Sequence, residues 1–433
     1  MLLRRVLILA SVSLAVRAAS DSSVSETTMP QCAVLCQKDA LANNVTECAV
    51  TNTSCLCNDT AFQGNVTACV TTTCNGREQM IAKRLSDRQC GIPPHKGRPE
   101  NDPGTIVPLI LSTLLIANRF ICKFMGLGGT WGADDLTIGI AYILAVSIFG
   151  TNISMIRYGF GQNMWDISPL DHITIMLKFF YAFTLQYKTQ ISLAKISVCL
   201  FLLRIFQSNV FRYTTYTVIA LNAAIAVTWV ITDSLHCIPV HLAWDQWETL
   251  EAGQCVNFID VTFANAFVNI GVDTVMVLMP VYEVMHLNLS SRKKLSVSVM
   301  FAMGLLLTIV AIIRVVVFWF NRWNTNPSVQ LQPIVYWSVV ETHIAVICAC
   351  LPTLRAMLVH LFPKLFPNAG DNSTAHKNTP SGRATFASSS QALNKSQINK
   401  TVSYTVDYDD DSKKKRPHRH SFVQLVEIDP REE

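Results

Sequence analysis

The sequence predicts an all-α membrane protein: a seven-transmembrane helix bundle with a small, disulfide-rich helical ectodomain at its N-terminus and a disordered cytoplasmic tail. Half of the 433 residues are hydrophobic and only 15% are charged, whereas soluble proteins carry about 25% charged residues. Eight of the fourteen cysteines fall within residues 32–90, and apolar stretches of membrane-spanning length recur from residue 105 onward. This composition excludes an ordinary cytosolic enzyme and a disordered regulator.

Residues 1–18 predict a secretory signal peptide. Arg4 and Arg5 precede an apolar run over residues 6–16, which ends at small residues suited to cleavage. The alternative, a first anchor helix, is disfavoured because the run is much shorter than the roughly 20 residues that a membrane-spanning helix needs. The mature chain is therefore expected to begin outside the cell.

Residues 30–92 are expected to form an ectodomain held together by disulfides, since a segment this short cannot bury a large core. Cys32 and Cys36 lie one helical turn apart, and Cys69 and Cys74 nearly so, which suits two short facing helices. A zinc site is the alternative. The oxidising compartment and the lack of histidine between residues 20 and 94 favour four disulfides instead.

Four acceptor sequons crowd the same segment, and their density supports a glycosylated extracellular domain. The expected glycosylation sites are Asn44, Asn52, Asn58 and Asn65.

The order of the eight cysteines, with Cys55 and Cys57 as a central Cys-x-Cys, resembles that of the fungal CFEM domain. The resemblance implies that Cys48 pairs with Cys55 and Cys57 with Cys90, which leaves four others to pair among themselves: Cys32, Cys36, Cys69 and Cys74.

Haem-binding CFEM domains use an aspartate three residues before the Cys-x-Cys as their iron ligand. Asn52 occupies that position here, and a neutral amide is a far poorer ligand for ferric iron than a carboxylate. The substitution therefore disfavours haem without excluding it, and we expect no cofactor and no metal. Asp59, just beyond Cys57, is a weak candidate for an oxygen ligand.

Residues 104–360 predict the membrane domain. The apolar windows are residues 105–125, 136–157, 173–203, 213–235, 258–282, 295–320 and 334–360. Lys and Arg gather beside one set of span ends, at Arg119, Lys123, Arg204, Arg212, Arg292, Lys293, Lys294, Arg355 and Lys364, with only Arg157 and Arg322 clearly on the other side. The crowded side is expected to be cytoplasmic, which places the C-terminus inside.

Several markers in this region resemble a fungal seven-transmembrane, rhodopsin-like receptor family that often carries a CFEM domain. They include residues 131–135 (Trp-Gly-Ala-Asp-Asp), 158–161 (Tyr-Gly-Phe-Gly), 195–197, 203–206, 237–239, 348–352, Trp165, Trp244, Cys255, Pro280, Gly304, Arg314 and Glu341. The resemblance implies a plasma-membrane receptor that signals through heterotrimeric G proteins. The Asp/Glu-Arg-Tyr and Asn-Pro-x-x-Tyr motifs of animal receptors are missing, and residues 334–360 contain no lysine for retinal.

Cys237 and Cys255 fall in one predicted outer loop, where an oxidising compartment favours a bridge between them. Four other cysteines suit packing inside the bundle or, near the inner face, acylation. These are Cys122, Cys199, Cys348 and Cys350.

Ionisable side chains inside the predicted spans each cost about 2.5–3.5 kcal/mol at mid-membrane, so they are expected to face inward and pair. By depth, Glu341 lies near Arg314, with Lys188 as a second donor, whereas Asp273 lies near Lys195. Both a register-fixing role and a ligand or switch role fit this placement. The complete set is Lys178, Lys188, Lys195, Asp273, Arg314 and Glu341.

The function we expect is that of a receptor, not an enzyme. It senses an unknown extracellular ligand and signals across the lipid bilayer to a cytoplasmic partner; no nucleic acid partner is expected, because the net charge of +5 forms no single patch. A haem- or iron-binding surface protein is the alternative. A transporter is a weaker rival, because no internal repeat is evident. Residues 361–433 are polar and predict a disordered tail.

Overall fold

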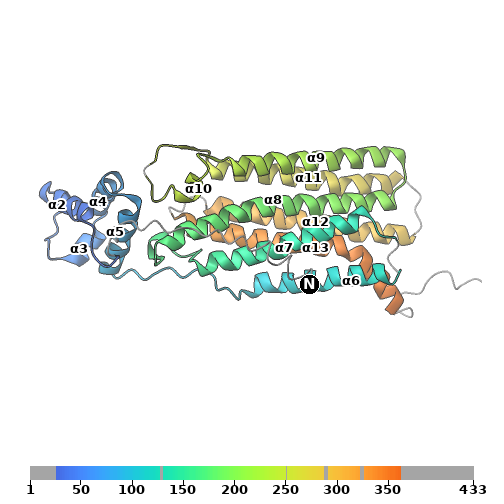
Figure 1. The fold of residues 1–433 in the computed structure, drawn as a ribbon, viewed down its shortest axis with the longest axis horizontal. Helices are drawn as coiled ribbons and strands as arrows, with labels where there is room; N and C mark the ends of the chain where they lie inside the picture. Colours follow the sequence, from blue (N-terminus) through green and yellow to red (C-terminus); the bar gives the residue numbers. More distant parts are fainter. Residues whose placement is uncertain (1–25, 127–129, 250, 287–290, 322–325, 362–433) are drawn as a thin grey trace, which may run out of the picture. The chain divides into compact units, whose positions relative to one another are not determined.

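A computed structural model describes residues 26–126, 130–249, 251–286, 291–321 and 326–361, and it confirms the predicted fold class (Figure 1). The predicted signal peptide, and all but the first residue of the predicted tail, lie outside these residues. The small domain contains α2 (Gln31–Ala42), α3 (Thr53–Asn58), α4 (Thr60–Thr73) and α5 (Gly76–Gln89). The bundle contains α6 (Pro103–Phe124), α7 (Ala133–Arg157), α8 (Asp171–Ile205), α9 (Asn209–Ser234), α11 (Phe258–His286), α12 (Ser291–Asn321) and α13 (Pro327–Leu361).

Short elements lie in the connections of the bundle. They are η1 (Met164–Asp166), β1 (Cys237–Ile238), α10 (Leu242–Asp245) and β2 (Gln254–Cys255). Strands β1 and β2 pair antiparallel between α9 and α11. We call this end of the bundle the loop end, and the end at which α6 turns into α7 the opposite end.

Six of the described helices are long and apolar enough to span a membrane: α6, α7, α9, α11, α12 and α13. The predicted third span, α8, is 35 residues long but does not belong to this set. Lys178, Lys188 and Lys195 lie along it and lower its mean hydropathy. The helix that would be least stable alone in lipid is thus the one that most needs partners.

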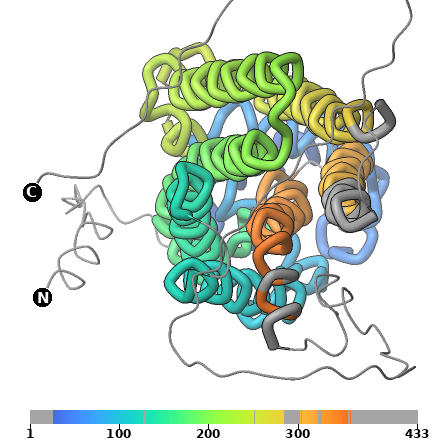
Figure 2. The backbone as a smooth tube through the Cα atoms, turned by 90° about the vertical axis from the view of Figure 1, so that its right-hand side faces the viewer, coloured from blue at the N-terminus to red at the C-terminus, as the bar shows by residue number. Residues whose placement is uncertain are grey.

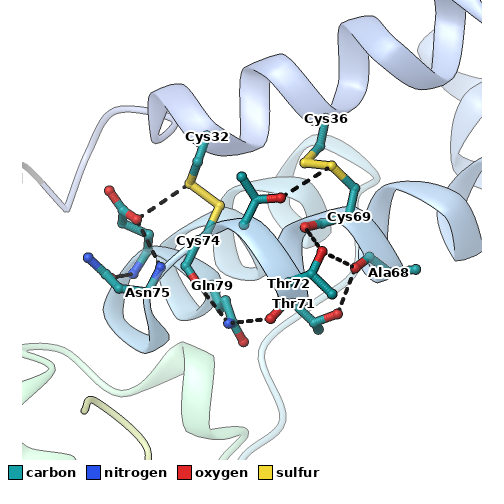
Figure 3. Close-up of a disulfide and its surroundings, with 11 residues drawn as sticks. Cys32, Cys36, Ala68, Cys69, Thr71, Thr72, Cys74, Asn75 and Gln79 are labelled. Atoms are coloured by element: carbon teal, nitrogen blue, oxygen red, sulfur yellow. Dashed lines mark hydrogen bonds between the residues drawn. A yellow bond between two sulfur atoms is a disulfide. The ribbon is translucent and has the colours of Figure 1, made fainter. Parts of the chain in front are cut away.

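Disulfides and helix caps hold the small domain together. Cys32 and Cys36 of α2 are bridged to Cys74 and Cys69, so that two bonds tie α2 to the end of α4 (Figure 3). The other bridges join Cys48 to Cys55 and Cys57 to Cys90. The side chain of Asp59 caps α4, and Asn75 with Glu78 forms a capping box on α5.

Helix α5 of the small domain also contacts the connection between α7 and α8. Ile81 is fully buried and belongs to the same apolar cluster as the core of the bundle. Arg84 donates to the carbonyl oxygen of Trp165 (2.5 Å), and Arg88 binds Asp166 (3.0 Å). These contacts give the small domain a polar and an apolar attachment at the loop end.

Small residues let α7 and α8 approach closely. Ile138, Ala141, Ala145 and Ile148 recur at helical spacing on one face of α7, and all four are fully buried. Alanine at two of these positions brings the backbones together without a cavity, as in many membrane bundles. This seam belongs to the main apolar core of the molecule.

Helix α13 is the inner helix of the bundle. In its membrane-spanning segment 67% of the residues are buried, against 17–33% for the other five candidate spans. It packs against α6, α7, α8 and α12, as the view along the helices shows (α13 in orange, Figure 2). Arg119 of α6 donates to the carbonyl oxygen of Ala349 in α13 (2.6 Å), near the opposite end.

A buried cluster of charges fastens α6, α7 and α8 at the opposite end. Arg119 donates to Asp134 (2.6 Å) and to Asp135 (2.9 Å). Lys123 binds Asp135 (2.9 Å), and Arg204 binds Asp134 (2.9 Å). We call these five residues the charge cluster. Arg119 and both carboxylates are each 1% exposed, so each charge depends on the others for stabilisation.

Replacing Arg119 with leucine is expected to destabilise the bundle. The change leaves Asp134 and Asp135 buried without their central partner, and breaking a buried pair in this way costs about 3–5 kcal/mol. Thermal unfolding of the purified protein in detergent should show a clearly lowered midpoint for Arg119→Leu.

Arg157→Leu is the matched control. Arg157 binds Glu100 at the bundle surface, and its side chain is 67% exposed, so water and salt screen the pair and its loss costs close to nothing. Equal shifts for the two variants would show that Arg119 is not a buried anchor.

Candidate functional site

A cavity of about 540 Å³ opens at the loop end of the bundle. Its wall is contributed by α8, α9, α11, α13 and the bridged connection between α9 and α11. Volumes of this size are typical of small-molecule sites. The residues that matter below are Phe180, Tyr181, Asp233, Trp244, Phe258 and Gln330.

A disulfide joins Cys237 to Cys255 in the connection that forms one wall of this loop-end cavity. The bridge directly links β1 to β2, whose paired residues are these two cysteines. Trp244 and Leu242 of the short α10 lie between them in sequence and line the cavity. The bridge therefore restrains the segment that carries part of the wall.

Asp233 connects the loop-end cavity to α8. Asp233 lines the cavity, and its carboxylate binds the ammonium group of Lys188 at 2.5 Å. Lys188 also lies over the ring of Trp229, 5.2 Å from its centroid. The expectation that Lys188 is a second donor to Glu341 is therefore wrong, because Asp233 of α9 holds the lysine instead.

Tyr187, next to Lys188 on α8, binds a second ion pair. Its hydroxyl donates to Glu341 of α13 (2.9 Å) and accepts from Arg314 of α12. Arg314 and Glu341 lie 3.4 Å apart, and both are 5% exposed. One buried cluster thus joins three helices at the same depth.

Lys195, two turns further along α8, binds α11. Its ammonium group lies 2.8 Å from Asp273 and donates to the side chain of Asn269 (3.0 Å). Lys195, Asp273 and Glu341 also line an inner cavity of about 80 Å³ between α8, α11, α12 and α13. Pro280 of α11 and Pro352 of α13 line the same cavity, and each lacks the N–H group that would donate a hydrogen bond within its helix.

Three cations of α8 therefore form a ladder of ion pairs from one end of the bundle to the other. Lys188 binds α9, Lys195 binds α11, and Arg204 binds α7 in the charge cluster. Residues 188 to 204 extend over about 24 Å at 1.5 Å per residue, which is most of the hydrocarbon thickness. We call these pairs the α8 ladder.

Sequence reasoning missed three sets of partners in the ladder. Asp233 lies within the apolar window 213–235, where an acidic residue indicates a buried cationic partner. Asp134 and Asp135 were recognised only as part of a family motif. Tyr187 gave no signal, because a tyrosine in an apolar helix is common. Of the predicted charged residues, Lys178 lies over the ring of Trp244, 5.8 Å from its centroid.

Asn52 and Asp59, the two residues considered as haem ligands, both cap helices of the small domain. The Oδ1 of Asn52 accepts from the backbone N–H of Cys55 and so caps α3. Asp59 is occupied as the cap of α4. Hydrogen bonds from the Thr46 hydroxyl and then from the Phe62 amide lower the pKa of its carboxyl group. The side-chain oxygens of both residues thus accept hydrogen bonds at helix N-termini.

The remaining predicted glycosylation sites lie on the small domain. Asn44 has a positive φ of 50°, and the amide groups of Asn58 and Asn65 donate to the carbonyl oxygens of Ser54 and Ala61. Their glycosylation stays a prediction.

Comparison with known proteins gives the same two parts. The fungal rhodopsin domain matches residues 118–360 and the CFEM domain matches residues 25–91. Receptor GIN3 of Arthrobotrys oligospora is 25% identical over 322 residues, 71% of this chain and 75% of that protein. An SAT4 family membrane protein of Emericella nidulans is 28% identical over 212 residues, 48% of this chain and 52% of that protein.

A third relative comes from a biosynthetic gene cluster. The polyenoic acids biosynthesis gene cluster protein Ba17b of Metarhizium anisopliae is 24% identical over 260 residues, 57% of this chain and 70% of that protein. No solved structure matches the chain.

Glu341→Leu is expected to destabilise the bundle by about 3–5 kcal/mol, because Arg314 then remains buried without its carboxylate. The double variant Glu341→Leu with Arg314→Leu removes both charges and should recover most of the loss. Thermal unfolding in detergent measures both effects. If Glu341→Leu alone unfolds like the parent protein, the pair does not stabilise the bundle.

Proposed function

Because the chain belongs to the fungal rhodopsin domain family and carries a CFEM domain, we propose that it is a plasma-membrane receptor. A ligand binds in the loop-end cavity, and the α8 ladder carries its effect to a cytoplasmic partner at the opposite end. The receptor relative supports a role in sensing. The six apolar helices support a multi-pass membrane protein embedded in the lipid bilayer.

One observation carries this proposal: Asp233 belongs both to the cavity wall and to the ladder. A ligand beside Asp233 changes the surroundings of its pair with Lys188. Tyr187, the neighbour of Lys188, binds the Arg314–Glu341 pair. A change at the cavity therefore has a short physical route to α12 and α13, whose arrangement those charges fix.

The loop end faces the outside of the cell in this proposal, and the opposite end faces the cytoplasm. The Cys237–Cys255 bridge supports this orientation, because disulfides persist in oxidising compartments. So does the excess of Lys and Arg at the opposite end, which includes Arg119, Lys123 and Arg204. The CFEM domain then lies outside the cell and the C-terminus inside.

The proposed cytoplasmic partner is a heterotrimeric G protein. The charge cluster at the opposite end holds three cations against two carboxylates, and its Arg204, with 33% of the side chain exposed, is the cation of the cluster that a cytoplasmic partner can reach. The membrane domain contributes binding and conformational change, not catalysis. This choice of partner is tested directly by nucleotide exchange.

Breaking the Asp233–Lys188 pair is expected to raise basal signalling. Asp233→Asn keeps the shape of the side chain but removes its charge, so the restraint on α8 weakens. Guanine-nucleotide exchange on a G-protein heterotrimer, measured in membranes that contain the full-length protein, should rise about fivefold or more, the lower range of allosteric coupling. The charge exchange Lys188→Asp with Asp233→Lys should return exchange toward the parent level.

Asp260→Asn is the matched control, since Asp260 is an exposed carboxylate at the same end of the bundle. It should leave exchange unchanged. If the parent protein and all variants, at equal amounts in the membrane, give the exchange of empty membranes, coupling to a G protein is wrong.

A further inference from the structure

We infer that the loop-end cavity binds an uncharged, mainly apolar molecule that carries a hydrogen-bond acceptor. This inference deepens the proposed function, because it gives the chemical class of the ligand for the same site. It rests on three features of the cavity wall: its aromatic surface, the internal pairing of its charges, and an amide donor that has no acceptor.

The wall presents two pairs of aromatic rings. Phe180 and Phe258 pack edge to face with their centroids 5.5 Å apart, and Tyr181 and Trp244 pack in the same way at 5.4 Å. The rings come from α8, α10 and α11, and all four line the cavity. Such a surface favours an apolar and preferably aromatic body, because it offers broad contact at little entropic cost.

The charge in the wall is paired. Asp233 is bound by Lys188 at 2.5 Å, and no lysine or arginine lines the cavity among the described residues; Lys178 lies over the ring of Trp244 and is not part of the wall. A cationic ligand would compete with Lys188 for one carboxylate, and an anionic ligand would find no uncommitted cation among the described residues of the wall. Moving a charged molecule from water into this cavity is therefore opposed by desolvation.

Gln330 of α13 supplies the polar anchor. It lines the cavity and is 7% exposed, and its Nε2 has no hydrogen-bond acceptor among the described residues. A buried donor without an acceptor destabilises the protein. A ligand carbonyl or ether oxygen within reach of the amide accepts its hydrogen bond and so removes the cost of the unpaired donor. A purely apolar ligand cannot do this.

Four naphthalene probes of similar shape test the inference on the full-length protein in nanodiscs: 2-acetylnaphthalene, 2-ethylnaphthalene, 2-naphthoate and 2-naphthylmethylammonium. Equilibrium dialysis against empty nanodiscs of the same lipid separates binding from partitioning. The acetyl probe should bind tightest. The two charged probes should bind at least about tenfold more weakly because of desolvation, and the ethyl probe about fivefold more weakly because it lacks the acceptor.

Two variants and one control variant locate the binding. Trp244→Ala should weaken binding of the acetyl probe about tenfold. Trp131 is an exposed tryptophan at the opposite end, and Trp131→Ala should leave the affinity unchanged. Gln330→Leu should abolish the preference for the acetyl over the ethyl probe while both still bind.

Equal or tighter binding of either charged probe would overturn the neutral ligand class. An unchanged affinity for the acetyl probe in Trp244→Ala would show that the probe does not bind in the loop-end cavity. A preference for the acetyl over the ethyl probe that persists in Gln330→Leu would show that Gln330 does not donate to the ligand. Dialysis requires no signalling partner. Loss of probe selectivity therefore contradicts this inference alone, whereas loss of nucleotide exchange contradicts the proposed function alone.

Discussion

The arrangement of the bundle depends on the cost of burying the cations of α8 among apolar helices. An unpaired charge in such surroundings costs several kcal/mol, and α8 carries Lys188, Lys195 and Arg204 along its length. Each finds a carboxylate on a different neighbour: α9, α11 and α7. Rotation or sliding of any of these helices against α8 would separate a pair, so the ion pairs fix the register that apolar packing alone leaves adjustable.

The same requirement links the two ends of the molecule. Lys188 near the loop end and Arg204 in the charge cluster both lie on α8. Tyr187 of the same helix also contacts Arg314 of α12 and Glu341 of α13. Aromatic rings and Asp233 occur together in the wall of the loop-end cavity, so the place best shaped for a ligand also touches the first step of the ladder. A receptor needs this combination, because binding must alter contacts that distinguish one helix arrangement from another.

Local properties of the sequence were enough to predict the fold class. Apolar length identifies spans, and cysteine spacing identifies a stapled domain. Depth also matched Asp273 to Lys195 and Glu341 to Arg314, and the structure pairs the same residues. Depth in the membrane did not predict the partner of Lys188, because depth does not tell which face of α9 turns toward α8. The loop-end cavity was not predictable either, since its wall combines residues from segments as far apart as Phe180 and Gln330.

A double-mutant cycle between Lys195 and Asp273 tests most directly whether paired charges on α8 hold the bundle. The unfolding free energy of the purified protein is measured for the parent, Lys195→Met, Asp273→Asn and the double variant. We expect a coupling energy of about 1–3 kcal/mol, with the double variant more stable than the sum of the two single losses would make it. Additive losses would mean that the two residues do not stabilise each other, and the ladder would not be what holds α8 to α11.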